Sequence, residues 1–439
     1  MSSATAVGRT IVEALLRAGM RHAVLAPGSR SAPVALALAQ AEKAGLVQLH
    51  VRIDERDAGF VALGLAKASN TVVPVVVTSG SAVANLFPAV VEAYHSGVSL
   101  VAVTADRPAK YRGTNAAQTI HQVGIFGEFV TAAVDIAPSA DGQAGQSTVA
   151  DQIDDVFKQT VGPVHLNVQF DVPLLPAPAD LEWTPQHTTP LDRGHHAAQP
   201  QHLSLPARGV MVVGDLIDLE IAQGAARLAE SLGWPIIWEP TSQVHAASTA
   251  VAHGPLLLAA DVLPIPEVVL TVGNVGLSRS VLGLLAKTEQ HIAVAAAPRS
   301  TVQPNGTLTA KLMLDVLPVV ASERDTEWLQ LWQHADAVAA SIVEQQLHGQ
   351  ALNGPRAAVA LWNALSDTDQ LCIAASWPVR HIEAYAPCRS GVRTFGNRGA
   401  NGIDGLISTA WGIAEGGAGQ TYLLVGDVAF LHDISGLNV

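Results

Sequence analysis

The sequence predicts an α/β protein of three domains with parallel sheets, the third of them truncated. Short apolar runs alternate with helical patterns along the 439 residues, and such alternation is typical of parallel sheets covered by helices. Apolar residues make up 49% of the chain and charged residues 14%, which is enough apolar side chain for a large core. The 37 glycines suit tight turns and close packing of helices on sheets.

The first predicted domain, residues 1–180, contains most of the strand–turn–helix units. Its expected strands are Ala23–Ala26, Gln48–Arg52, Val73–Thr78, Leu100–Thr104 and Val164–Val168, and its expected helices are Pro33–Glu42, Asp57–Ala68 and Ala82–His95. In parallel sheets of this kind, ligands bind at the carboxyl ends of the strands. The loops that follow these strands are therefore the first place to look for a site.

Residues 181–207 are predicted to form a linker, because they are rich in Pro, His, Gln and Thr and show little periodicity. A central α/β domain is expected over residues 208–340. Its expected elements are the strands Gly209–Val213, Pro235–Trp238 and Val268–Val272, the helix Ile217–Leu232 and a polar helical stretch over residues 326–350.

The third α/β domain is expected over residues 350–439. Its expected elements are the helix Ala357–Leu365, the strands Gln370–Ala374 and Thr421–Val425, and a Gly/Ala-rich helix after Ile403. Only 12 residues follow Asp427, too few for the further strands of such a domain. The sequence therefore predicts that this domain is incomplete at its carboxyl end.

The composition excludes several classes of protein. A net charge of −13 disfavours nucleic-acid binding, which requires a basic face. Cys372 and Cys388 are too few for a disulfide framework and fit no zinc motif. Arg9, Glu13 and Arg17 interrupt any signal-peptide core, and no apolar run reaches the roughly 18–20 residues of a membrane span. We therefore expect a cytoplasmic protein.

Polar motifs stand at the ends of four predicted strands of the first domain. Gly28-Ser29-Arg30 offers backbone N–H groups and a guanidinium to an anion. Asp54-Glu55-Arg56 places carboxyl groups beside an apolar helix, where acid–base chemistry is feasible. Ser79-Gly80 and Asp106-Arg107 end the next two strands, and Gln118 follows them. Each loop alone also fits an ordinary turn, but together they predict one wall of a pocket.

These motifs resemble the thiamin diphosphate-dependent enzymes, in particular the carboligases of menaquinone biosynthesis. The third block carries the same resemblance in Ser376, Arg380, Asn397-Arg398-Gly399, the run from Asn401 to Gly405 that includes Ile403, and Val425-Gly426-Asp427. Order and spacing match along nearly the whole chain, and the middle block matches least. The resemblance implies three α/β domains of the thiamin diphosphate-enzyme type.

The resemblance also implies how the cofactor is bound. A glutamate at the position of Glu55 hydrogen-bonds the aminopyrimidine ring and promotes deprotonation of the thiazolium carbon. Ser79 and Gly80 contact the cofactor, and Ile403 wedges between its two rings. Gly426 approaches the diphosphate, and Asp427 binds Mg²⁺ or Mn²⁺.

This metal motif departs from the family pattern at two points. Val428 follows Asp427 where many of these enzymes have glycine, a change that the menaquinone subfamily tolerates. The asparagine that completes the site is expected roughly two dozen residues after the aspartate, and Asn438 is too close to serve. We therefore expect the chain, as it stands, to hold the cofactor poorly.

The family's substrates, 2-oxoglutarate and isochorismate, are both dicarboxylates, and converging arginines neutralise such charges. The resemblance assigns substrate contacts to Ser29, Arg30, Arg107, Gln118, Arg279, Ser376, Arg380 and Arg398. It implies decarboxylation of 2-oxoglutarate and 1,4-addition of the resulting carbanion to isochorismate. Because the family's cofactor lies between subunits, it also implies a homodimer or a dimer of dimers.

Three other interpretations stay open. Another thiamin diphosphate enzyme, such as an acetolactate synthase or a 2-oxoacid decarboxylase, would lack this set of arginines. A non-catalytic fragment or paralogue would keep the fold without the complete metal site. Binding of NAD is disfavoured, because no G-x-G-x-x-G motif follows a predicted strand.

Overall fold

The computed structural model describes residues 3–138, 142–186, 189–191, 199–294, 310–314, 316–349 and 351–438, and for residues 142–145 and 310–314 the backbone alone. The chain divides into two compact units. The first comprises residues 1–196, 399–417 and 428–439, and the second comprises residues 197–398 and 418–427. The last predicted domain, residues 350–439, thus contributes segments to both units, and the three predicted domain boundaries stay a prediction.

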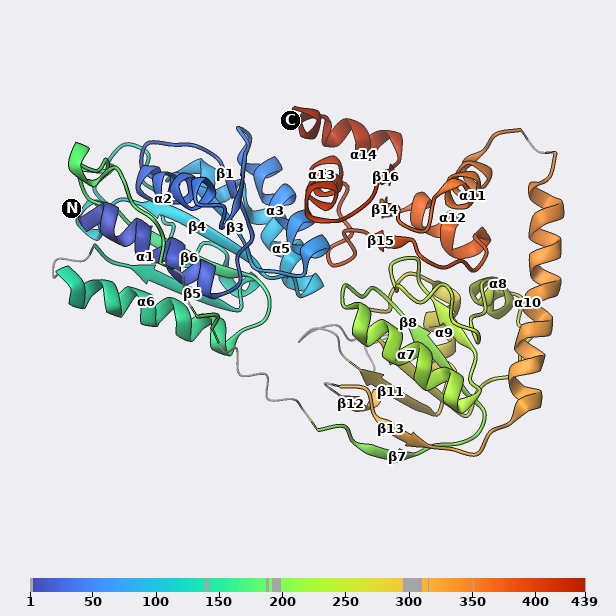
Figure 1. The fold of residues 1–439 in the computed structure, drawn as a ribbon. Helices are drawn as coiled ribbons and strands as arrows, with labels where there is room; N and C mark the ends of the chain where they lie inside the picture. Colours follow the sequence, from blue (N-terminus) through green and yellow to red (C-terminus); the bar gives the residue numbers. More distant parts are fainter. Residues whose placement is uncertain are drawn as a thin grey trace. The chain divides into compact units, whose positions relative to one another are not determined.

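The first unit is built on a six-stranded parallel sheet with strand order β2-β1-β3-β4-β6-β5 (Figure 1). The strands are β1 (His22–Leu25), β2 (Gln48–Val51), β3 (Val73–Val77), β4 (Leu100–Asp106), β5 (Ala132–Ile136) and β6 (Val164–Gln169). All the strands predicted here are confirmed to within two residues. The sequence did not predict β5, because this half-exposed edge strand lacks the apolar run that reveals the buried strands.

Helices cover both faces of this sheet. They are α1 (Ser3–Arg17), α2 (Ala32–Lys43), α3 (Glu55–Ser69), α4 (Ser81–Ala84), α5 (Phe87–Ser96), α6 (Gly142–Gln159) and α13 (Leu406–Gly416), with short 3₁₀ turns at η1 (Ala109–Tyr111), η2 (Gly127–Phe129), η3 (Pro178–Asp180) and η5 (Ile434–Leu437). Val76 faces a core shared with α1, α2 and α6. Its neighbours Val75 and Val77 are equally buried on the opposite face, because side chains alternate along a strand.

The predicted helix Ala82–His95 is wrong in one respect, because the structure contains two helices there. Helix α4 ends at Ala84 and α5 begins at Phe87. Pro88 lies in the first turn of α5, where a missing N–H costs nothing, but its ring would clash with the carbonyl of Ala84 in a continuous helix. The break redirects the chain directly after the Ser79-Gly80 loop.

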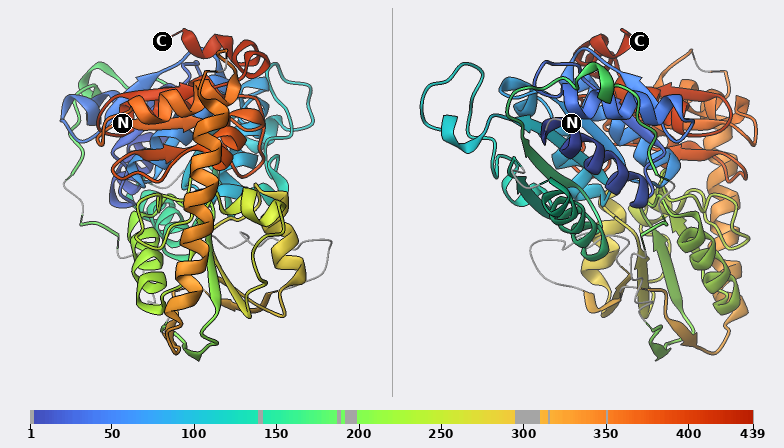
Figure 2. Two further views of the ribbon diagram at one scale, coloured as in Figure 1. Left: turned by 90° about the vertical axis from the view of Figure 1, so that its right-hand side faces the viewer. Right: turned by 60° about the vertical axis from the view of Figure 1, so that its left-hand side comes forward.

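The second unit contains a five-stranded parallel sheet with strand order β12-β11-β10-β8-β9 (Figure 2). Its strands are β8 (Gly209–Val213), β9 (Ile236–Trp238), β10 (Val268–Val272), β11 (Gln290–Val294) and β12 (Ala310–Leu314). Met211 and Val213 face α7 (Leu219–Leu232). Val210 and Val212 face the opposite core, which is closed by α8 (Gly254–Ala259), α9 (Arg279–Lys287) and α10 (Thr326–Leu347).

A three-stranded parallel sheet, ordered β15-β14-β16, also belongs to the second unit. Its strands are β14 (Gln370–Ile373), β15 (Arg393–Phe395) and β16 (Thr421–Leu424), and the associated helices are α11 (Gly354–Ala364), α12 (Trp377–Tyr385) and α14, which begins at Asp427 and ends at His432. Trp238 of the five-stranded sheet stacks on Trp362 of α11 with ring centroids 6.2 Å apart, so one core serves both sheets.

Two short strands pair outside these sheets. β7 (His202–Ser204) pairs in parallel with β13 (Val319–Ala321), so part of the predicted linker is a strand. Within the described ranges, no helix combines the length and the apolarity that crossing a membrane requires.

Candidate functional site

The structure places nearly all the predicted site residues directly after the carboxyl end of a parallel strand. They are Ser29 and Arg30 after β1, Glu55 after β2, Ser79 and Gly80 after β3, Arg107 after β4, Arg279 after β10, Ser376 and Arg380 after β14, Arg398 after β15, and Gly426 and Asp427 after β16. Gln118 and Ile403 lie in loops farther from a strand. The predicted position at strand ends is confirmed, and the chemical roles stay predictions.

Glu55 is the first residue of α3, and its position follows from the cap of that helix. The Asp54 carboxylate accepts hydrogen bonds from the backbone N–H groups of Arg56 and Asp57, so the helix starts at Glu55. The Glu55 side chain is half-buried, and Asn85 Nδ2 lies 3.4 Å from its Oε2. One carboxylate oxygen is thus held in the first helical turn, where the helix dipole favours negative charge.

The Ser79-Gly80 loop is fixed by two glutamines. Gly80 has a φ of 89° and donates its N–H to Gln122 Oε1 at 2.9 Å. The Ser79 carbonyl accepts from Gln118 Nε2 at 3.0 Å. The Ser79 hydroxyl is buried, and no group in the described part of the chain hydrogen-bonds it. A buried hydroxyl without a partner is costly, and it suits a site that awaits a ligand.

Gln122 is a residue whose importance the sequence did not reveal. Its side-chain N–H₂ donates to the Ala105 carbonyl at 3.2 Å and to Asn167 Oδ1 at 3.1 Å. Together with the bond from Gly80, these contacts tie the ends of β3, β4 and β6 to one side chain. A buried glutamine has no periodic pattern in a sequence, and only the three-dimensional contacts identify it.

Arg30 and Arg107 lie within electrostatic range of each other in the first unit. Arg30 donates to the Phe170 carbonyl at 2.9 Å, and Arg107 Nε donates to the Ala117 carbonyl at 2.8 Å. Burial and, after it, the positive charge of Arg107 lower the pKa of the Arg30 guanidinium. Two guanidinium groups held against their own repulsion form a binding site for an anion.

A buried salt-bridge network supports the loop that carries Arg107. Asp106 is fully buried and lies 3.0 Å from Arg112 Nη2. The same guanidinium reaches Asp135 at 2.9 Å, and Asn167 Nδ2 donates to both carboxylates at 3.1 and 2.8 Å. The loop after β4 is therefore anchored to β5 and β6.

The loop that carries Ile403 is anchored by Glu92. The Glu92 carboxylate accepts the backbone N–H groups of Gly399 at 3.0 Å and Ala400 at 2.6 Å. Gly405 adopts a φ of 64°, and a Cβ there would lie 1.9 Å from the Phe60 ring. Ile403 stands between these fixed points with 39% of its surface exposed. An apolar side chain presented in this way fits the predicted role of a wedge.

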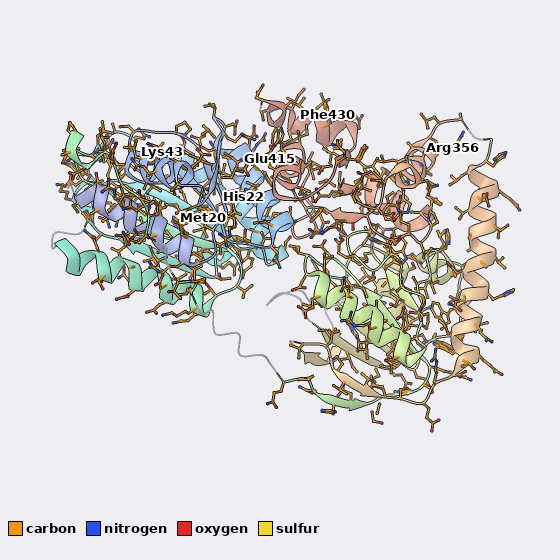
Figure 3. The ribbon with its side chains drawn as sticks, viewed as in Figure 1. Met20, His22, Lys43, Arg356, Glu415 and Phe430 are labelled. Carbon is orange, nitrogen blue, oxygen red and sulfur yellow. The ribbon has the colours of Figure 1, made fainter. Side chains whose placement is uncertain are left out.

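Helix α13 packs closely on α3 within the first unit (Figure 1). Gln48 Nε2 donates to Glu415 Oε2 of α13 at 3.3 Å. Burial lowers the pKa of His22, and the charge of Glu415 partly offsets this effect; both side chains are labelled in Figure 3. The segment after α14 also reaches α3, because Ser435 Oγ donates to Asp57 Oδ1 at 3.1 Å.

The second unit holds the other predicted substrate residues. Ser376 has a φ of 74° and precedes α12, a conformation that is rare for a residue with a side chain. Backbone strain of this kind clusters at functional sites. Ser376, Arg380 and Arg279 are exposed, whereas Arg398 is almost completely buried.

Arg398 faces two buried carboxyl groups that the sequence did not identify, Glu239 and Glu383. Glu239 follows β9, and its Oε1 accepts the N–H groups of Gly276 and Leu277 at 2.8 and 2.7 Å. Burial raises the pKa of Glu239, and the positive charge of Arg398 opposes this rise. Burial and the charge of Glu239 raise the pKa of Glu383 to about 8, against the charges of Arg398 and Arg380.

The strand-end rule could have identified Glu239, because it follows β9 as Glu55 follows β2. Glu383 gave no such signal, because α12 was not predicted and its acidic residue looked like an ordinary helical one. On this helix Glu383 lies three residues after Arg380, so the two side chains share one face.

Gly426 and Asp427 offer a small opening for a diphosphate and its metal. A Cβ on Gly426 would meet no atom within 4 Å, and Asp427 is exposed at the start of α14. Over the described ranges, no group of three His, Cys, Asp or Glu side chains is arranged to hold a metal ion. The donors that the described residues place here fit a metal bound through one carboxylate and the phosphate oxygens of a ligand.

Two family descriptions match most of this chain. Residues 5–125 match "Thiamine pyrophosphate enzyme, N-terminal TPP binding domain", and residues 179–373 match "Middle domain of thiamine pyrophosphate". The first match includes the loops after β1 to β4.

Curated bacterial proteins named 2-succinyl-5-enolpyruvyl-6-hydroxy-3-cyclohexene-1-carboxylate synthase are similar along the whole chain. The protein of Paenarthrobacter aurescens (strain TC1) is 40% identical over 99% of this chain and 78% of its own length. That of Kineococcus radiotolerans is 40% identical over 100% of this chain and 80% of its own length. That of Thermobifida fusca (strain YX) is 38% identical over 100% and 81%.

Proposed function

Because the chain belongs to the 2-succinyl-5-enolpyruvyl-6-hydroxy-3-cyclohexene-1-carboxylate synthase family of thiamin diphosphate-dependent enzymes, we propose that it catalyses this family's carboligation. The reaction decarboxylates 2-oxoglutarate and adds the remaining four-carbon unit to isochorismate by 1,4-addition. The observation that carries the proposal is the pair Arg30–Arg107, which forms a binding site for an anion at the same sheet edge as Glu55.

Glu55 is proposed to bind the aminopyrimidine ring of thiamin diphosphate. Its carboxylate is held by the helix cap and by Asn85, so it needs little reorganisation to accept or share a proton with a ring nitrogen. The buried hydroxyl of Ser79 and the backbone of Gly80 line the same edge. When bound, the cofactor supplies the electron sink for the decarboxylation.

The arginines are proposed to bind the carboxylates of the two substrates. Arg30 and Arg107 act in the first unit with Ser29 and Gln118, and Arg380 and Arg398 act in the second unit with Ser376 and Arg279. Each guanidinium can form two parallel hydrogen bonds to a carboxylate. Few acid–base side chains are needed beyond Glu55, because the substrates bring charge rather than protons to be moved.

Asp427 is proposed to bind Mg²⁺ or Mn²⁺ together with the diphosphate. Its exposed carboxylate and the open backbone of Gly426 support this role, because Mg²⁺ accepts one or two carboxylates plus phosphate oxygens. An assembly into a homodimer or a dimer of dimers and a cytoplasmic location belong to the same proposal. Sedimentation and cell fractionation test these two points.

The decisive test measures carbon dioxide release from 2-oxoglutarate with thiamin diphosphate and Mg²⁺, with and without isochorismate. We expect release that depends on 2-oxoglutarate and a coupled product that appears only with isochorismate. Pyruvate in place of 2-oxoglutarate distinguishes the alternative 2-oxoacid carboligases and decarboxylases. Faster turnover of pyruvate would contradict the proposal, as would the lack of any turnover.

The variant Glu55→Gln tests the assigned catalytic group. We expect kcat to fall by roughly 10²–10⁴-fold, the usual contribution of a positioned acid–base group. Glu344→Gln is the matched control, because Glu344 is exposed on α10 and should leave kcat unchanged. Equal activity of the two variants would remove Glu55 from the mechanism.

A further inference from the structure

Two carboxyl groups are buried together beside Arg398 in the second unit. Glu239 and Glu383 retain only 2% and 7% of their exposed surface. They come from different elements, the end of β9 and the middle of α12. Burying two like charges side by side is unfavourable unless one of them is neutral or both are paired.

Glu239 is the member of the pair that carries the negative charge. Its Oε1 accepts two backbone N–H groups, from Gly276 and Leu277, and the charge of Arg398 also favours its ionised form. The one opposing charge on a neighbouring element is Asp215, which follows β8. Hydrogen bonds of this kind are strongest to a carboxylate.

Glu383 is the member that stays neutral. The negative charge of Glu239 faces it from β9, and the positive charges of Arg398 and Arg380 face it from β15 and from its own helix. Burial and Glu239 outweigh the two arginines, so the Glu383 pKa rises to about 8. Within the described residues, Glu383 Oε1 and Glu239 Oε2 have no hydrogen-bond partner although both atoms are buried.

We propose that Glu383 is a positioning residue for the reaction. Kept neutral by the carboxylate of Glu239, it leaves the Arg398 guanidinium available to a substrate carboxylate. This inference rests on the proposed function, because it takes from it the role of Arg398 in substrate binding. It goes further in naming a protonated acid that controls how strongly that arginine attracts an anion.

The charge balance of the cluster explains the effect. With Glu383 neutral, the charges of Arg380 and Arg398 are matched by those of Glu239 and Asp215, and an incoming carboxylate meets no net repulsion. When Glu383 loses its proton, the cluster becomes net negative and Arg398 gains a second competing carboxylate. Substrate binding should therefore weaken as the pH rises through about 8.

The test compares KM and kcat for 2-oxoglutarate and isochorismate between pH 6.5 and 9.5 in the full chain and in Glu383→Gln. In the unmodified chain we expect the KM of one substrate to rise by about tenfold above pH 8, the size of one screened charge interaction, while kcat changes little. Glu383→Gln cannot ionise, so its KM should stay low and flat across this range. Glu344→Gln on α10 should behave as the unmodified chain does.

A second variant guards against a misfolded Glu383→Gln. Glu239→Gln removes the charge that raises the pKa of Glu383, so the rise in KM should begin at lower pH, a shift that a purely structural role would not cause. Infrared spectra of the ligand-free chain at pH 7 should show the C=O band of a protonated carboxylic acid, and this band should be lost at pH 9 and in Glu383→Gln.

The outcomes separate this inference from the proposed function. A flat KM in an active, unmodified chain, or the absence of the carboxylic acid band at pH 7, would overturn the positioning role alone. Calorimetric binding of 2-oxoglutarate that weakens above pH 8 without any turnover would reject the proposed reaction and support the inference. A chain that binds no dicarboxylate at any pH would reject both.

Discussion

Lys67 and Glu92 form an ion pair inside the first unit, with Nζ 3.1 Å from Oε1 and only 2% and 3% of the two side chains exposed. Lys67 belongs to α3 and Glu92 to α5. The same carboxylate accepts hydrogen bonds from Ser96 Oγ at 2.6 Å and from the backbone of Gly399 and Ala400. Glu92 therefore joins the helix that begins at Glu55 to the loop that carries Ile403.

Glu92→Gln should destabilise the first unit more than Lys67→Met does. The first change removes the carboxylate that faces a buried ammonium and weakens several hydrogen bonds, and breaking a buried pair from one side costs about 3–5 kcal/mol. After Lys67→Met, the carboxylate keeps Ser96 and the two backbone N–H groups. Urea unfolding measures both variants, and equal losses would show that the hydrogen bonds to the loop contribute nothing.

Helix α13 packs on α3 through glycines that have no room for a methyl group. A Cβ on Gly412 would lie 2.1 Å from the Val61 carbonyl oxygen. Gly412→Ala should therefore lower the free energy of unfolding by about 1–3 kcal/mol, the usual cost of overpacking. Thermal unfolding at constant pH measures the change.

Gly283→Ala is the matched control for this prediction. Gly283 also lies inside a helix, α9, but a Cβ there would meet nothing within 4 Å. Alanine favours the helix by about 1 kcal/mol over glycine, so this variant should be at least as stable as the unmodified chain. A loss of stability in Gly283→Ala equal to that in Gly412→Ala would contradict the packing argument.

Much of this arrangement could be predicted from the sequence, because buried parallel strands are apolar runs and polar loops follow them. The positions of Arg30, Glu55 and Ser79 at strand ends needed no other information. The Glu92 contacts could not be predicted, since they join residues more than 300 positions apart. A glutamate in an apolar helix and a glycine in a loop carry no local sign that they will meet.

The unpredicted residues share a physical cause. Gln122 and Glu383 are polar side chains whose importance comes from burial, and burial of a single polar residue leaves no periodic pattern. The edge strand β5 and the break before α5 depend on weaker local effects, exposure on one side and a proline in the first helical turn. Sequence patterns identify the elements that form the core more readily than the contacts between them.

Arg107→Gln should weaken substrate binding without destabilising the protein. The loss of one charge-assisted pair of hydrogen bonds, worth about 1.5–3 kcal/mol, should raise the KM of one substrate by roughly tenfold to a hundredfold. The melting temperature should stay the same or rise, because the positive charge of Arg107 opposes that of Arg30.

Arg227→Gln provides the comparison for Arg107→Gln, because Arg227 is exposed on α7 and has no assigned role. Steady-state kinetics and a thermal melt of both variants are sufficient. If Arg107→Gln lowered the melting temperature and left both KM values unchanged, Arg107 would have a structural role instead of a binding role.

The buried histidines should make the protein less stable as the pH falls below 6.5. Burial lowers the pKa of His165, His245 and His291 to about 4. The unfolded chain therefore takes up protons from pH 6.5 downward while the folded chain does not. Each such group reduces the free energy of unfolding by up to about 1.4 kcal/mol per pH unit between pH 6.5 and 4, and its contribution is complete above pH 6.5.

His291→Gln isolates one of these groups, because glutamine can still hydrogen-bond Thr271 Oγ1, which lies 3.0 Å from His291 Nε2. Urea unfolding at pH 7.5, 6.0 and 5.0 should give a pH dependence smaller by about one proton than in the unmodified chain. The exposed His348 supplies the control His348→Gln, whose pH dependence should be unchanged. Glu383 acts in the opposite sense, since a raised carboxyl pKa stabilises the folded chain at low pH, but it contributes equally to all three proteins and cancels in the comparison. If His291→Gln and His348→Gln had the same pH dependence, His291 would take up its proton in the folded state, and burial would not explain the acid sensitivity.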